Sequence, residues 1–181
     1  METSYLSSQE LQQIGFASLG ASVQISRFAR FYGAENLSIG DFVRIDDFVV
    51  ISTLQKSSIG KYVHIAPAVV ISSPLSLQIG DYSTISSRCS VYGQSDDFSG
   101  DYLTNPTLPK ELRNLKQSEI RIGEHVIIGT GSTLLPGANL GNGVALGAMS
   151  LLKDSADEWC IYAGIPASRL KTRSKSCLDL I

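Results

Sequence analysis

Large apolar residues recur at every sixth position over most of the chain, as at Ile59, Ile65 and Ile71. The step lengthens to eight between one set of three and the next, as from Ile71 to Ile79. An α-helix repeats near 3.6 residues and an ordinary strand near 2, so neither explains a step of six. Six-residue repeats are typical of a parallel β-helix, in which three hexads make one turn of about 18 residues. The pattern predicts an all-β fold of five to six turns.

A second regularity supports the same fold. The fourth position after each large apolar residue is small in most hexads, and these positions are Val23, Ala29, Val43, Val49, Val63, Val69, Ser83, Cys89, Val126, Ser132, Ala138, Val144 and Ser150. A small side chain beside every large one indicates that both stack inside a narrow tube. We therefore expect Cys89 to be a buried and unreactive thiol.

The repeat divides the chain into segments. Residues 1–18 precede it and are expected to be helical, with Ser7–Glu10 as a capping box and Gly15 as the stop. The coil covers residues 19–165 and is interrupted by residues 92–119, an excursion long enough to suggest function. Its Tyr, Phe, Leu and Pro content predicts an ordered arm that reaches across a neighbouring subunit. The basic tail, residues 166–181, is expected to form a terminal helix.

Composition narrows the function. Fifteen Lys and Arg against seventeen Asp and Glu give a formal charge of −2, which excludes the basic surface of a duplex-binding protein. There is no apolar run of the roughly 20 residues that span a membrane, and no secretory signal pattern at the N-terminus. Three cysteines without C-x-x-C spacing argue against disulfides or a zinc knuckle. We expect a cytoplasmic protein with no metal, nucleic-acid or membrane partner.

Two stretches carry a family resemblance. "IGEHVIIGTGSTLLPGANLGNGVALGAMSLL" followed by "IYAGIPASRLK" resembles the C-terminal half of hexapeptide-repeat acyltransferases, such as the galactoside, maltose and xenobiotic acetyltransferases. The resemblance extends over residues 19–173. It implies a left-handed parallel β-helix, a homotrimer, and acetyl-CoA bound as co-substrate between neighbouring subunits. In addition, "VHIAP" and "SDDFSG" resemble a sub-group of sugar O-acyltransferases of polysaccharide biosynthesis.

The catalytic histidine of the resembled enzymes has no counterpart here, because Gln94 occupies its place. Glutamine cannot accept a proton at neutral pH, so either the protein is inactive or another residue is the base. His64 precedes Ile65 and points outward at a corner; with the resemblance, it is the preferred base, oriented by Asp96 or Asp97. His125 is the competing candidate.

Other site residues follow from the resemblance or from position. Gln94 and Ser95 begin the arm and are expected to line the acceptor pocket. The resemblance places Thr130, Gly147, Ala148 and Ser150 along the pantetheine arm of CoA, and Lys153, Arg169 and Lys171 near its phosphates. The Asp46-Asp47 pair is interpreted as a solvated edge rather than a metal site.

These expectations combine into one function. The chain is expected to transfer an acetyl group from acetyl-CoA to a hydroxyl or amine of a nucleotide-sugar or polysaccharide precursor, with His64 as the base. An antibiotic (xenobiotic) acetyltransferase would share the fold and the cofactor. A catalytically silent β-helix scaffold is the non-enzymatic alternative, because Gln94 replaces the usual histidine.

Overall fold

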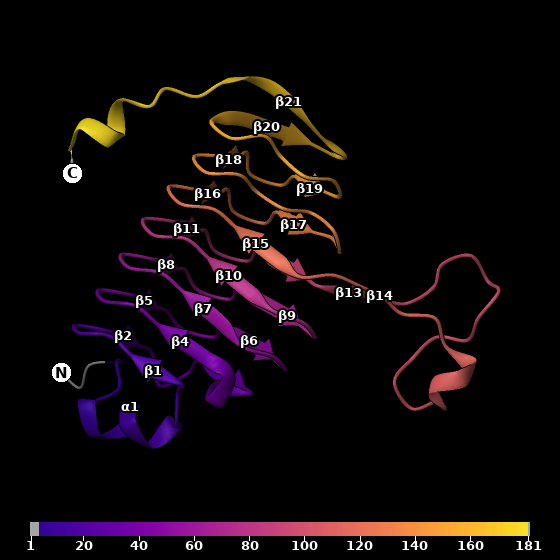
Figure 1. Cartoon of the computed structure of the whole chain (residues 1–181), viewed down its shortest axis with the longest axis horizontal. Coiled ribbons are helices and arrows are strands. Elements are labelled where there is room, and N and C mark those ends of the chain that lie inside the picture. Colours follow the sequence, from indigo (N-terminus) through magenta and orange to yellow (C-terminus); the bar gives the residue numbers. More distant parts are fainter. Residues whose placement is uncertain (1–3, 181) are drawn as a thin grey trace.

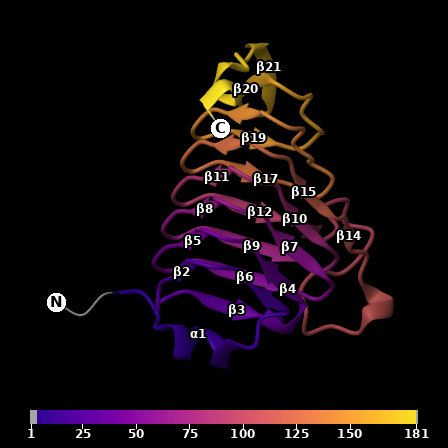
Figure 2. The ribbon, with the colours of Figure 1, turned by 60° about the vertical axis from the view of Figure 1, so that its left-hand side comes forward.

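Short parallel strands build most of the protein, and most hexads of the sequence form one strand each. The computed structural model describes residues 4–180, and its coils stack along one axis from the N-terminal helix to the C-terminal tail (Figures 1 and 2). Each strand pairs with the equivalent strand of the next coil, for example Ile45 with Ile65 and Ile65 with Ile85. The all-β, parallel β-helical fold is confirmed.

Three sheets form the three faces of the coil. The first face contains β1 (Ser18–Leu19), β4 (Leu37–Ile39), β7 (Ser57–Ile59), β10 (Leu77–Ile79) and β15 (Ile120–Ile122). The second contains β2 (Gln24–Ile25), β5 (Arg44–Ile45), β8 (His64–Ile65), β11 (Thr84–Ile85), β16 (Ile127–Ile128), β18 (Ala145–Leu146), β20 (Cys160–Gly164) and β21 (Ala167–Thr172). The third contains β3 (Arg30–Tyr32), β6 (Val50–Thr53), β9 (Val70–Ser73), β12 (Ser90–Tyr92), β17 (Thr133–Leu134) and β19 (Leu151–Leu152).

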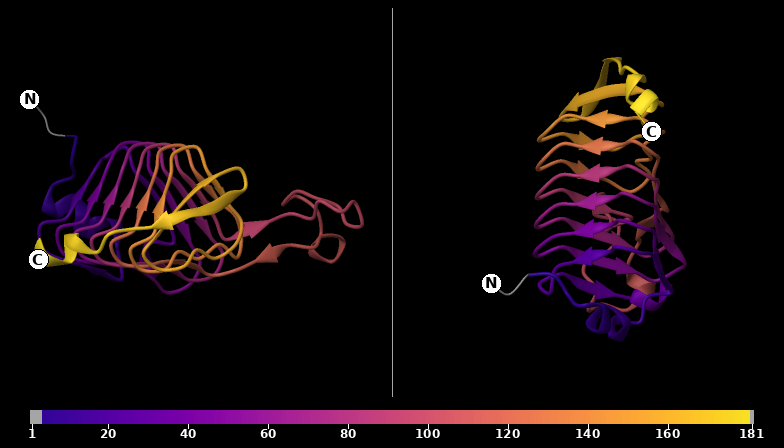
Figure 3. Two further views of the ribbon diagram at one scale, coloured as in Figure 1. Left: turned by 90° about the horizontal axis from the view of Figure 1, so that it is seen from above. Right: turned by 90° about the vertical axis from the view of Figure 1, so that its left-hand side faces the viewer.

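The number of coils exceeds the five to six expected. Seven parallel strands follow one another on the second face, from β2 to β20. The right-hand view of Figure 3 shows the coils stacked one above another. The last coil was missed because β20, which begins at Cys160, does not continue the six-residue step. Pairing with β18 extends the solenoid nonetheless, since the open edge of β18 offers unpaired backbone groups to the returning chain.

The interior follows the two regularities of the sequence. Ile25, Ile45, Ile65 and Ile85 are buried in one column of the second face. The serines that occur at small inward positions are also buried, and their hydroxyls bond to the backbone of the adjacent coil. Ser83 Oγ donates to Gly123 O at 2.8 Å, which leaves no buried hydroxyl without a partner there.

Both ends of the coil are covered. Helix α1 (Ser8–Ile14) begins at the predicted capping box, where Ser7 and Glu10 cap each other, and ends at Gly15 in the left-handed conformation. The C-terminal helix predicted from Pro166 onward is wrong: β21 returns antiparallel along β20, and only η3 (Ser176–Leu180), a 3₁₀ segment, follows. Pairing along the free edge of β20 satisfies backbone groups that a helix would leave exposed.

The arm, residues 92–119, leaves the coil after β12 and extends away from it (Figures 1 and 3). Its base is an antiparallel pair, β13 (Gln94–Ser95) with β14 (Lys116–Gln117), and η2 (Lys110–Leu112) lies near its tip. One further 3₁₀ element, η1 (Ala34–Asn36), interrupts the early coils. No helix among residues 4–180 has the length and apolarity to cross a bilayer.

Candidate active site

His64 stands on the outer side of the second face and is held by a carboxylate of the preceding coil. Its Nε2 lies 2.8 Å from Oδ2 of Asp46, and 38% of its side chain is exposed. Strand register places His64 between Arg44 below and Thr84 above. The outward orientation expected for His64 is therefore confirmed, and the imidazole is both anchored on one side and accessible.

Asp46 is the centre of a polar network. Its Oδ1 accepts hydrogen bonds from Arg44 Nε at 2.7 Å and from the Tyr5 hydroxyl at 3.1 Å, and only 7% of the residue is exposed. The interpretation of Asp46 as a solvated edge is therefore wrong. Tyr5 and Arg44 cover the carboxylate on one side and His64 closes the other, so that each oxygen is paired.

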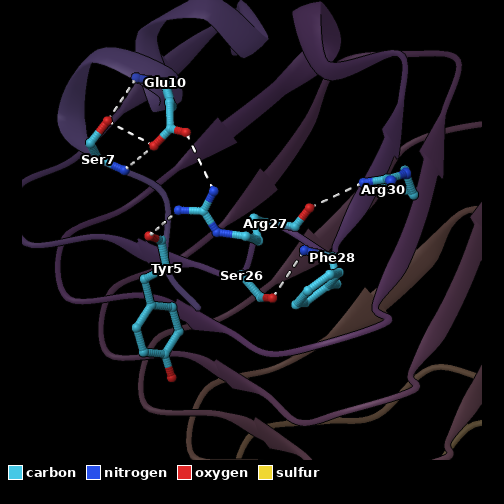
Figure 4. A network of polar contacts seen from close by, with 7 residues as sticks. All are labelled: Tyr5, Ser7, Glu10, Ser26, Arg27, Phe28 and Arg30. Atoms are coloured by element: carbon cyan, nitrogen blue, oxygen red, sulfur yellow. Dashed lines mark hydrogen bonds and ion pairs between the residues drawn. The ribbon is translucent and has the colours of Figure 1, made fainter. Parts of the chain in front are cut away.

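The N-terminal segment brings Tyr5 to this position. Glu10 caps Ser7 and forms an ion pair with Arg27 at 3.7 Å, which fixes α1 against the first coil (Figure 4). Tyr5 bridges to Ser26 in an antiparallel pair, and its carbonyl accepts from Arg27 Nη2 at 3.5 Å. The ring of Tyr5 then points away from the helix and reaches Asp46 in the next coil.

The electrostatics of Asp46 decide which histidine nitrogen carries the proton. Burial acts to raise the pKa of Asp46, but hydrogen bonds from Arg44, His64 and Tyr5 outweigh it and leave the pKa below its usual value. An ionised carboxylate can only accept, so Nε2 of His64 is the protonated nitrogen. In the neutral ring Nδ1 is then the acceptor nitrogen, and this is the form that a general base requires.

The aspartates of the arm do not orient His64 within the chain. Asp97 Oδ1 accepts from the backbone N–H of Ser99 at 2.8 Å, and Oδ2 accepts from Asn114 at 3.4 Å. The hydrogen bond from the Ser99 hydroxyl is the main cause that lowers the pKa of Asp97. In the single chain Asp46 contacts the ring and neither arm aspartate does, because the arm projects away from the coil.

A pocket of about 530 Å³ lies at the base of the arm. It is lined by Ser95, Asp96, Asp97, Phe98, Asn114 and Lys116. The side chain of Asp96 has no polar partner among the described residues, whereas Asp97 is occupied by its own loop. Asp96 is thus the carboxylate of this pocket that is available to a ligand.

Gln94 and Ser95 have structural contacts of their own. Gln94 is exposed on β13, and its Oε1 accepts from Gln117 Nε2 of β14 at 3.4 Å. Ser95 Oγ donates to the carbonyl of Asp96 at 3.0 Å. Ser95 also lines the pocket, while Gln94 contacts β14 at the base of the arm.

His125, the competing base, belongs to a different part of the surface. Its ring is stacked on Tyr82 at 5.0 Å between centroids and lies 6.1 Å from the ring of Trp159. Phe42, Tyr62 and Tyr82 continue this stack, with centroid distances of 4.7 and 5.2 Å. We call the column Phe42–Tyr62–Tyr82–His125–Trp159, between the first and second faces, the stacked corner. With both ring faces covered, His125 has a packing role.

The other border of the second face, leading to the third, carries Asp46 and four of the residues expected along CoA. We call it the open corner, and it comprises residues 46–49, 66–69, 86–89, 129–132 and 147–150. Thr130 and Ala148 are exposed on it in successive coils, because Ile128 pairs with Leu146. Ile127 lies two coils above His64, about 10 Å along the axis at the usual strand spacing, and Thr130 is three residues further along the chain. Acyl donor and base thus occupy one edge of the coil if CoA binds where the resemblance implies.

Gly147 and Ser150 flank this edge from inside. Gly147 N–H donates to Tyr162 O at 2.8 Å, and its carbonyl accepts from Ser132 Oγ at 2.9 Å. Ser150 is buried, and its Oγ accepts from Gly164 N–H at 3.1 Å. The side chain of Ser150 therefore holds the coil together and does not face a groove.

The three candidate phosphate ligands differ in what already surrounds them. Lys153 pairs with Asp154 at 3.6 Å on the surface. Arg169 Nε donates to Cys160 Sγ at 3.1 Å, which raises the pKa of the guanidinium. Lys171, on β21, has no charged partner among residues 4–180 and is the most available of the three.

Sequence reasoning missed Tyr5, Arg44 and Asp46 as site residues. A signal for Arg44 and His64 was present, since both directly precede the core isoleucine of their hexads. No sequence signal pointed to Tyr5, because it lies in the N-terminal segment outside the repeat and reaches Asp46 only in the folded chain.

Fold and site together define a class, the β-solenoid acyltransferases with a histidine on the coil and an arm beside it. No protein-family model matches the chain. A dTDP-4-amino-4,6-dideoxy-D-glucose acyltransferase of Escherichia coli is 43% identical over 177 residues, which are 97% of this chain and 92% of that protein. The chain therefore belongs to the sugar acyltransferase family of that relative and is an acyltransferase.

Solved structures agree with this family. AntD, an N-acyltransferase from Bacillus cereus in complex with dTDP and 3-hydroxybutyryl-CoA, is 42% identical with a TM-score of 0.95, covering 99% of this chain and 95% of that one. A maltose O-acetyltransferase from Clostridium difficile 630 is 17% identical with a TM-score of 0.62, covering 92% and 75%. The second likeness concerns the fold alone, in line with the hexapeptide-repeat resemblance.

Proposed function

We propose that this protein transfers an acyl group from acyl-CoA to the amino group of a dTDP-linked 4-amino-4,6-dideoxy sugar in the cytoplasm. The observation that carries the proposal is similarity over the whole chain, arm and open corner included, to an acyltransferase of that name. AntD has been crystallised with dTDP-4-amino-4,6-dideoxyglucose and Coenzyme A, at 41% identity. The proposed acceptor group is therefore an amine, whereas the sequence alone left both a hydroxyl and an amine open.

His64 is the proposed base. The amine attacks the thioester carbonyl, a C–N bond forms and the C–S bond breaks, and the CoA thiolate leaves. Nδ1 of His64 takes the amine proton and returns it to the thiolate. Asp46 holds the ring at 2.8 Å and stabilises the imidazolium that forms during the transfer. No other imidazole among the described residues has this combination of anchoring and exposure.

Asp96 is the proposed contact for the acceptor amine. Its carboxylate is available in the arm pocket and suits an ammonium group. In AntD, a serine and an aspartate ten positions apart were each substituted in crystals with dTDP or dTDP-4-amino-4,6-dideoxyglucose. Ser86 and Asp96 have the same spacing here, as do Ser87 and Asp97. Because Asp97 is engaged by Ser99, the first pair is the better match.

A homotrimer is the proposed assembly. The arm points away from its own coil, so Asp96 can meet a His64 only across a subunit boundary. Phe98, which lines the pocket at the base of the arm, is 93% exposed in the single chain, and Tyr102, Leu103 and Leu112 of the arm are exposed as well. Apolar side chains of this size gain by contact with another chain. CoA is proposed to lie between subunits, along Thr130 and Ala148, with its phosphates near Lys171.

Transfer to dTDP-4-amino-4,6-dideoxyglucose from acetyl-CoA and from 3-hydroxybutyryl-CoA tests the activity, with release of free CoA as the measurement. We expect turnover with the amino sugar and none with dTDP-glucose, which lacks the amine. Activity on chloramphenicol or a streptogramin instead would favour the xenobiotic alternative.

Sedimentation should give three chains of 19.5 kDa, about 59 kDa. A monomer that binds CoA normally would contradict the proposed assembly.

A further inference from the structure

A break interrupts the side chains on the open corner. Phe48, Ala68 and Arg88 occupy the same position in successive coils, each with φ of 60°. The backbone confirms the register, because Ala68 N–H donates to Asp47 O and Arg88 N–H donates to Pro67 O. Each coil rises by about 4.8 Å, so Phe48 and Arg88 are separated by about 10 Å with only a methyl group between them.

Phe48 and Arg88, which lie on either side of the break, have no stacking or ion-pair partner among the described residues on the side that faces it. Phe48 meets Phe28 at 5.7 Å between centroids on the lower side, yet 63% of Phe48 is exposed. The Arg88 guanidinium has no carboxylate or carbonyl partner within the described part of the chain. Asp47, the nearest acid along this corner, is occupied by the Ser26 hydroxyl. An uncovered aromatic face and an unpaired cation thus adjoin the same space.

The backbone does not require a small residue at position 68. On the stacked corner of the same coil, Tyr62 has φ of 55° and carries a full aromatic ring between Phe42 and Tyr82. Phe48 and Arg88 themselves adopt the conformation of Ala68 with long side chains. The methyl group at position 68 therefore leaves space that the fold itself could fill.

We propose that this break binds the nucleotide half of the acceptor: a pyrimidine base stacks on Phe48 above Ala68, and the diphosphate pairs with Arg88. The inference rests on the proposed function, because it locates one part of that acceptor. Base stacking on an aromatic ring tolerates any base, and a guanidinium matches phosphate oxygens in a bidentate manner. His64 lies four residues before Ala68, at most about 14 Å of chain, which directs the sugar toward the imidazole.

Calorimetric titration of the purified protein with dTDP tests the subsite. Ala68→Phe would extend the column as Tyr62 does on the other corner, and it is expected to weaken dTDP binding by more than about tenfold. Phe48→Ala should weaken it about 5- to 100-fold, the range of one lost base stack. Arg88→Gln should weaken dTDP about tenfold or more and leave thymidine, which has no phosphate, unchanged. Phe42→Ala, on the stacked corner, is the matched control and should bind dTDP normally.

The outcomes distinguish failure of the proposed nucleotide subsite from failure of the proposed function. Normal dTDP binding by both Ala68→Phe and Arg88→Gln, in an enzyme that still acylates the amino sugar, overturns the subsite and leaves the function standing. A wild-type protein that neither binds dTDP nor acylates the sugar overturns both. Loss of the trimer in Phe48→Ala, with dTDP affinity intact, would assign this corner to a subunit contact. If Ala68→Phe does not fold, the Phe48 and Arg88 variants decide the question.

Discussion

The stacked corner and the open corner border the same face, and both place non-glycine residues in the left-handed conformation. Tyr62 and Ala68 belong to one coil and have φ of 55° and 60°. On the stacked corner the rings of Phe42, Tyr62, Tyr82 and His125 continue without a gap. On the open corner the column runs Phe48, Ala68, Arg88, and each level differs in size and charge from the next.

The difference shows that the same backbone conformation carries a continuous stack of rings on one edge and an interrupted column on the other. A residue in the left-handed conformation costs about 1–2 kcal/mol, and stacked rings at the coil spacing offset that cost. Trp159 completes the stack beside Gly143, where a Cβ would come within 2.3 Å of the indole. Arg173 locks this end by donating to His125 O at 2.7 Å. The open corner lacks such a continuous stack, and its surface is the proposed site for ligands.

The largest contrast is expected between the two histidines. His64→Ala should lower turnover by about 10²- to 10⁴-fold, the usual loss for a positioned acid–base group, because the amine proton then has no acceptor. CoA affinity measured by calorimetry should stay within about twofold. His125→Ala should leave turnover nearly unchanged and lower Tm, because it opens a gap in the stack. Full activity of His64→Ala would show that another group, or the substrate itself, takes the proton.

The next largest effect on turnover tests whether Asp46 or an aspartate of the arm supports His64. Asp46→Asn should lower turnover about 10- to 100-fold, since the amide can present either a donor or an acceptor to Nε2 and no longer fixes the tautomer. Tyr5→Phe removes one hydrogen bond to Asp46 and should cost only a few-fold. If Asp46→Asn is fully active while Asp96→Asn is not, the arm and not the coil supports the base.

The lowered pKa of Asp46 also predicts that the stability of the protein depends on pH. Its pKa is lowered in the folded protein, so its contribution to stability is complete above the ordinary aspartate pKa near 4 and is lost as pH falls through the lowered value. The Tm difference between wild type and Asp46→Asn should therefore be largest near pH 6 and narrow toward pH 3 in scanning calorimetry. A difference that widens in acid would contradict an ionised Asp46.

A smaller effect concerns the stack alone. Tyr62→Ala removes two ring pairs, at 4.7 and 5.2 Å, worth about 1–3 kcal/mol together. At about 2–4 °C per kcal/mol for a domain of this size, Tm should fall by about 2–12 °C. Turnover at 25 °C should remain within about twofold. A tenfold loss of activity without a loss of Tm would place substrate on the stacked corner.

Much of the fold could be predicted from the sequence because the hexad is a local pattern that every coil repeats. The inward columns of Ile65 and Ile85, the buried Ser83 and the cap at Ser7 all follow from spacing. The partner of His64 did not, because burial of Asp46 depends on Tyr5, forty-one positions away and outside the repeat. The strand at β21 was missed for a similar reason: the edge of β20 that it pairs with exists only after the coil is complete.

The smallest effect is expected from Cys89, the inward residue of the open corner in the coil of Ser83. Cys89 is fully buried, its Sγ donates to Gly129 O at 3.1 Å, and burial raises the pKa of the thiol. The next coils carry Ser132 and Ser150 at the same inward position, and Ser132 Oγ donates to Gly147 O at 2.9 Å. Cys89→Ser can make the equivalent bond, so Tm should change by less than about 3 °C and turnover should not change.

In the native protein a thiol reagent should label Cys177, which is partly exposed, and leave Cys89 unmodified until the coil unfolds. Rapid labelling of Cys89 would mean that this corner opens in solution, and the contrast between a rigid interior and a ligand-binding surface would then fail.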